Sequence, residues 1–125
     1  MSSQLTLDEN NAKYQIRGYK PGYIQVNEQI FTHSLVVTAN TLIEEWPPQS
    51  LAELQKEHLD CILTLRPSIL LIGTGATLEF PDISLYGHLI NQGIGVEVMD
   101  TSAASRTYNA LTAEGRLVAA ALIIS

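Results

Sequence analysis

The chain of 125 residues carries seven lysines and arginines against thirteen aspartates and glutamates, a net charge of -6 at pH 7. This charge repels the phosphates of nucleic acids and of anionic membranes, so we expect neither as a partner. The length and a hydrophobic fraction of 46% suit one globular domain. The single cysteine, Cys61, favours a reducing cytoplasm, and no segment is apolar for long enough to cross a membrane.

The first half of the chain has the texture of a β-sheet. Residues 1–12 are polar and acidic, and we expect them to form a loose arm ahead of a single α/β domain over residues 13–125. From Tyr14 to Ala39 apolar and polar residues alternate, with turn-like breaks at residues 20–22 and 27–28. This pattern predicts an antiparallel meander of about three strands.

A helix is expected next, because two prolines after Trp46 end the meander. Ser50 is a candidate N-cap and Glu53 completes a capping box, so the helix should begin there and end before Pro67. The run "SILLIGTG" that follows is apolar and is stopped by glycines. It predicts a strand buried on both faces of a sheet.

The rest of the chain alternates helices and strands. Ile83 to Asn91 predicts a second helix, "IGVEVMD" a strand, Ala103 to Glu114 a third helix with Gly115 after its end, and "RLVAAALII" a last buried strand. Strands separated by helices are typical of parallel crossovers. The sequence therefore predicts an α/β (α+β) fold, with a mixed central sheet, an N-terminal antiparallel layer and about three helices.

Two segments predict a binding site for a small anion. Gly73, Thr74 and Gly75 follow a strand, where backbone amides either make a tight turn or hold a phosphate or carboxylate. Thr101 to Arg106 begin a helix after the next strand, where some amides are left free for an anion. If the two strands are parallel neighbours, both segments lie at the same edge of the sheet.

Arg106 is the charged residue of this candidate site. A cation near the start of a helix opposes the helix dipole, so we expect a compensating anion. That anion is either an internal carboxylate, Asp100 or Glu97, or an external ligand. Tyr108 and Asn109 either line the same pocket or pack and cap nearby backbone.

We find no catalytic set and predict no metal or cofactor. The three histidines, His33, His58 and His88, lie far apart in the sequence, and His58 with Cys61 forms only half a metal site. No G-x-S-x-G nucleophile motif is present, and Cys61 lies in an apolar stretch where thiols are usually inert. These absences favour a protein that is not an enzyme.

The segments "LLIGTG", "GVEVMDT", "AASRTYNAL" and "EGRLVAAALI" resemble a family of small uncharacterised proteins. The family includes the mitochondrial respiratory complex I assembly factor 3 and the adipogenesis-associated domain protein. The resemblance implies a three-layer β+β/α fold with a mixed central sheet and a β-hairpin layer. The positions that match are Gly73, Thr74, Gly75, Glu97, Met99, Asp100, Thr101, Arg106, Thr107, Tyr108, Asn109 and Glu114.

The resemblance also guides the expected function. The mitochondrial relative acts by binding other assembly proteins, which favours a non-enzymatic binding or assembly module with a protein partner or a homodimer. The alternative is an anion-binding protein, or an enzyme, with its site between Gly73–Gly75 and Thr101–Arg106. This sequence has no basic, serine-rich presequence, so we expect a bacterial cytoplasmic member.

Overall fold

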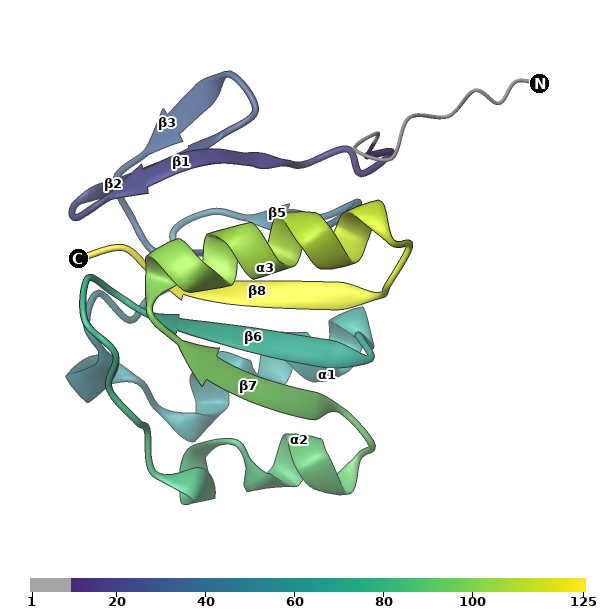
Figure 1. Ribbon diagram of the computed structural model, residues 1–125. Coiled ribbons are helices and arrows are strands. Elements are labelled where there is room, and N and C mark those ends of the chain that lie inside the picture. Colours follow the sequence, from purple (N-terminus) through teal and green to yellow (C-terminus); the bar gives the residue numbers. More distant parts are fainter. Residues whose placement is uncertain (1–9) are drawn as a thin grey trace.

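The structure, a computed structural model, describes residues 10–125 as two sheets and three α-helices (Figure 1). The first sheet is antiparallel and contains β1 (Ile16–Lys20), β2 (Tyr23–Val26) and β3 (Gln29–Phe31). The second has the order β5-β4-β8-β6-β7 and contains β4 (Leu35–Thr38), β5 (Leu42–Ile43), β6 (Ile69–Thr74), β7 (Gly95–Met99) and β8 (Val118–Ile123). The helices are α1 (Asp60–Leu65), α2 (Gly87–Asn91) and α3 (Thr101–Ala113). Residues 1–9 of the expected arm lie outside the described part.

The expected α/β fold with a mixed central sheet is confirmed. Strand β6 is parallel to both β7 and β8, while β4 is antiparallel to β8. Helix α3 and the three-stranded sheet cover one face of the central sheet, and α1 and α2 cover the other (Figure 1). Side chains of β8 therefore alternate between two cores, and all six of its residues are buried. This explains its continuous apolar sequence.

The predicted antiparallel meander of three strands is found, but the end of its segment, β4, belongs to the central sheet. Among the described strands, β1, β2 and β3 form the outer layer, whereas β4 crosses to the central sheet and pairs Leu35 with Leu122 of β8. The physical reason is the run Leu35–Val37, in which all three residues are buried. Such a run needs cover on both faces, which the outer layer does not provide.

The helix predicted from Ser50 to Pro67 is also wrong in detail. It is divided into 3-10 turns at Leu51–Glu53 and Lys56–Leu59, followed by α1. The Ser50 side chain makes no cap; the capping box is instead formed by Gln55 and His58. The break lets Leu54 and Leu59, five positions apart, both reach the same core, which one helix face does not allow.

The second helix is shorter than predicted, and the third agrees closely. Ile83–Leu85 forms a 3-10 turn before α2. Helix α3 starts at Thr101, where the Asp100 carboxylate accepts a hydrogen bond of 2.8 Å from the Ala103 amide. Gly115 follows its end with a φ of 79°, a conformation that favours glycine.

Candidate functional site

The two segments predicted to form an anion site meet, but they are bonded to each other. The Gly75 amide donates to Thr101 Oγ1 at 2.8 Å, and the Thr101 amide donates to the Gly75 carbonyl at 2.9 Å. The Thr101 hydroxyl in turn donates to the Ile123 carbonyl of β8. Thr101 is fully buried, and this junction closes the end of the sheet. The two amides and the hydroxyl are already hydrogen-bonded within the protein and are not free to bind an anion.

Gly73 is required by the same close packing. A Cβ atom at this position would lie 2.8 Å from Leu122 Cδ2 and 2.9 Å from Thr101 Oγ1. Gly75 has a φ of 98°, which side chains rarely tolerate. The two glycines that resembled a ligand loop thus have a structural reason to be glycine.

Thr74 organises the loop that follows β6. Its hydroxyl donates to the Thr77 carbonyl at 2.7 Å and accepts from the Glu79 amide at 3.2 Å. The Ala76 amide donates to the Ser125 carbonyl at 3.1 Å. These bonds fix the backbone of residues 76–83, which we call the apolar loop.

The apolar loop displays three large hydrophobic side chains to solvent. Leu78, Phe80 and Ile83 are 50%, 76% and 63% exposed. At the end of the loop, the Ser84 amide donates to Asp82 Oδ1 at 2.9 Å, and this hydrogen bonding lowers the pKa of the Asp82 carboxyl. Sequence reasoning missed the loop, although three apolar residues among turn-forming ones were its signal.

Tyr108 and Asn109 attach the N-terminal layer to α3. The Tyr108 hydroxyl donates to the Tyr14 carbonyl at 2.7 Å, and its burial raises the pKa of the phenol. The side chain of Asn109 donates from Nδ2 to the Ile16 carbonyl at 2.7 Å, and its Oδ1 accepts from the backbone amide of Ile16 at 3.0 Å. Both side chains thus bind nearby backbone, and Asn109 also lines a hollow that it shares with Arg106.

Residues 10–12 continue this attachment. Asn10 Nδ2 donates to Thr112 Oγ1 at 3.0 Å and to the Asn109 carbonyl at 3.2 Å. The end of the expected arm is therefore hydrogen-bonded to α3.

Arg106 points away from the junction. Its side chain is exposed and donates from Nη1 to Ser102 Oγ at 2.8 Å. Within residues 10–125 it pairs with no carboxylate, so neither Asp100 nor Glu97 is the internal partner that the sequence suggested. Instead, Arg106 lines a hollow of about 240 Å³, the β1–α3 hollow, formed by Ile16, Arg17, Gly18, Tyr19, Ser102, Ser105, Arg106 and Asn109.

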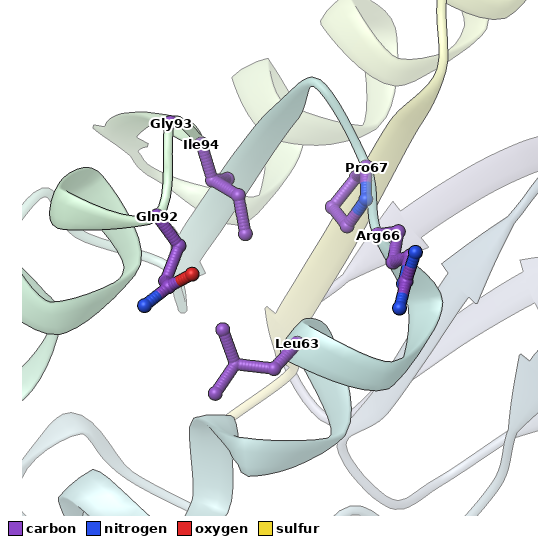
Figure 2. A pocket seen from close by; sticks show the side chains of 6 residues that line it. All are labelled: Leu63, Arg66, Pro67, Gln92, Gly93 and Ile94. Atoms are coloured by element: carbon purple, nitrogen blue, oxygen red, sulfur yellow. The ribbon is translucent and has the colours of Figure 1, made fainter.

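Two further hollows lie near the amino ends of the parallel strands. One, of about 650 Å³, is bordered by Leu63 and Ile94, with Gln92 on one side and Arg66 on the other (Figure 2). A second, of about 210 Å³, shares Arg66 and also contacts Arg116. Neither lining includes a nucleophile paired with a general base, so neither forms a catalytic set.

His58 and Cys61 are used locally. His58 Nδ1 accepts from the Gln55 amide at 2.9 Å, and Cys61 Sγ contacts the His58 carbonyl at 3.6 Å. Burial and the neighbouring Asp60 charge raise the pKa of the Cys61 thiol, which lowers the fraction of reactive thiolate. Among the described residues, no three His, Cys, Asp or Glu side chains gather for a metal ion.

The buried side chain of His88 gives a prediction about stability. Both of its ring nitrogens are buried and have no hydrogen-bond partner within residues 10–125. Unpaired buried polar atoms destabilise a protein. His88→Leu should therefore leave the free energy of unfolding unchanged or raise it, by at most about 1 kcal/mol. Urea denaturation measures the change, and exposed His33→Leu is the control, expected to stay within about 0.5 kcal/mol. A clear loss of stability in His88→Leu would show that the ring makes a favourable polar interaction.

Comparison with known proteins places this geometry in a family. The chain is 30% identical to the "13 kDa major membrane protein" of Francisella tularensis, over 95% of this chain and 99% of that protein. It is 34% identical to the NADH dehydrogenase (ubiquinone) 1 alpha subcomplex assembly factor 3 of Danio rerio, over 92% of this chain and 67% of that protein. Despite the first name, none of the helices in the described part is long and apolar enough to span a bilayer.

Solved structures agree with this placement. An NMR structure of a Xanthomonas campestris protein superposes with a TM-score of 0.81 at 38% identity, covering 99% of this chain and 92% of that one. A family model described as a protein of unknown function (DUF498/DUF598) matches residues 16–123. The resemblance seen in the sequence is thereby confirmed, and the chain belongs to the DUF498/DUF598 family.

Proposed function

We propose that this protein is a non-enzymatic binding module that docks another protein on its apolar loop. The observation that carries the proposal is the exposure of Leu78, Phe80 and Ile83 within six positions. Solvent-exposed clusters of large apolar side chains are typical of interaction sites. Aromatic side chains such as Phe80 also contribute much of the binding energy at protein interfaces.

Hydrogen bonds fix the backbone of the apolar loop. Thr74 bonds to both Thr77 and Glu79, and Asp82 caps the turn at Ser84. A loop with a fixed backbone loses less conformational entropy on binding than a flexible one. The arrangement therefore supports docking with little backbone rearrangement.

The charges of the loop favour a protein surface over a membrane. Glu79 and Asp82 lie between the apolar side chains, and the whole chain has a net charge of -6. Anionic lipid headgroups repel such a surface. A partner with apolar pockets and basic residues at their rim is complementary to it. The free thiol of Cys61 suits a cytoplasmic setting for this complex.

The relatives support the same class of function. Assembly factor 3 proteins are named for the assembly of NADH dehydrogenase, and the chain spans 67% of the Danio rerio protein and 45% of the Xenopus tropicalis one. From these relatives we infer the general role of binding a protein.

Photo-cross-linking tests the proposal in the cells that produce the protein. A benzoylphenylalanine at position 80 should give one discrete adduct with a second, different protein. Leu78→Ser with Ile83→Ser should abolish this adduct, because the double variant removes apolar contacts. Both side chains are largely exposed, so each change should alter the free energy of unfolding by no more than about 0.5 kcal/mol.

The matched control carries the same cross-linker at Leu117, which is 67% exposed and lies outside the loop. Position 117 should not yield the adduct. The same products from both positions would contradict a specific site on the loop. An adduct of two copies of this chain would contradict a heterologous partner and point to a homodimer.

A further inference from the structure

The β1–α3 hollow is formed by β1 and by residues 102–109 of α3, and none of its lining residues belongs to the apolar loop. It brings together two of the seven basic residues of the chain, Arg17 from β1 and Arg106 from α3. No aspartate or glutamate is among the residues that line it. Burial and the charge of Asp100 raise the pKa of Tyr19, so one carboxylate lies near the two arginines that line this hollow.

Arg17 is placed there by an irregularity in its strand. Ile16 pairs with Val26 and Gly18 pairs with Gln25, so Arg17 has no residue opposite it on β2. A bulge of this kind bends a strand and redirects one side chain. At the same position Asn109 binds both backbone groups of Ile16, which fixes the bulge against α3.

Arg106 is placed by its own helix. Its hydrogen bond to Ser102 Oγ holds the guanidinium along the first turns of α3, where the helix dipole disfavours a cation. Because Ser102 Oγ accepts this bond, its own hydroxyl proton remains available to another acceptor. The site therefore presents two guanidinium groups and one hydroxyl donor.

We infer that the β1–α3 hollow binds a phosphoryl group through Arg17, Arg106 and Ser102. A phosphate monoester carries a charge of about -1.5 to -2 at neutral pH, which two guanidinium groups neutralise. The volume of about 240 Å³ is below that of sites for drug-sized ligands, about 300–1,000 Å³, so the ligand is small. Its source is either free phosphate or a small phosphate monoester.

An NMR titration of the intact protein tests this inference with three probes at matched ionic strength: inorganic phosphate, glycerol phosphate and acetate. Phosphate should cause saturable shifts centred on the amides of Arg17, Gly18, Ser102 and Arg106. Tighter binding of glycerol phosphate would identify a monoester as the ligand, whereas equal binding would identify the free ion. Acetate binding as tight as phosphate would overturn the choice of a phosphoryl group.

Charge-matched variants complete the test. Arg17→Gln and Arg106→Gln should each weaken phosphate binding about tenfold or more, the loss expected for a charge-assisted hydrogen bond. Lys56→Gln changes the net charge equally at an exposed residue that lines none of the three hollows described above, and it should change the Kd less than twofold. An equal loss in all three variants, or shifts that never saturate, would overturn the site. Thermal melts of the three exposed-residue variants should match, which separates lost binding from lost folding.

Discussion

Thr101→Val is expected to lower the free energy of unfolding by about 2–4 kcal/mol, because it leaves buried hydrogen-bonding groups without partners. The Thr101 hydroxyl accepts from the Gly75 amide and donates to the Ile123 carbonyl, and all of these groups lie at the closed end of the central sheet. Valine has nearly the same shape, so the change removes polar contacts and leaves the packing intact. Urea denaturation monitored by circular dichroism measures the loss.

The control is Thr101→Ser, which keeps the hydroxyl and removes one methyl group. It should cost about 1 kcal/mol, the usual loss for one buried methyl. If serine and valine were equally destabilising, packing would explain the role of Thr101. If valine were neutral, the junction would not depend on this hydroxyl.

Asn109→Ala is expected to lower the free energy of unfolding by about 2 kcal/mol and to loosen the outer sheet selectively. The Asn109 side chain satisfies both backbone groups of Ile16, which no neighbouring strand pairs at that side. Each group that loses its partner in a partly buried position costs about 1 kcal/mol or more. Hydrogen exchange should therefore speed up in β1 and β2 more than in β6 and β8.

Asn91→Ala is the matched control for this prediction. Asn91 is exposed at the end of α2, and its side chain has no hydrogen bond within the described residues, so stability should change by no more than about 0.5 kcal/mol. Uniformly faster exchange in the Asn109 variant would mean that the two layers unfold together. Unchanged exchange in β1 and β2 would show that this amide does not hold the outer layer.

The sequence alone predicted the central part of the fold, since its signals there are strong and local. β6 and β8 are continuous apolar runs, and α3 has an aspartate cap at its start and a glycine after its end. Alternation of strands with helices predicted their parallel arrangement, which the structure confirms. These features depend on residues within a few positions of one another, so the sequence displays them directly.

Which sheet a strand joins and where a helix breaks depended on distant residues. β4 enters the central sheet because β8, more than 80 positions later, offers it a partner and a second covered face. The helix expected from Ser50 is interrupted because the core shared by Leu54 and Leu59 outweighs a good local capping pattern. Tertiary packing commonly overrides such local preferences.

The candidate site shows the same division. The sequence alone predicted that Gly73–Gly75 and Thr101–Arg106 lie at one edge of the sheet if the strands before them are parallel neighbours, and β6 and β7 are such neighbours. Only the tertiary structure decided that Thr101 bonds to Gly75 there, and that Arg106 and Arg17 line one hollow. Successive residues of one helix point in different directions. What each of them contacts depends on layers that remote parts of the chain contribute. The physical reason is that sequence spacing determines which residues share one face of a helix or strand. The layer that packs on that face determines which groups those residues contact.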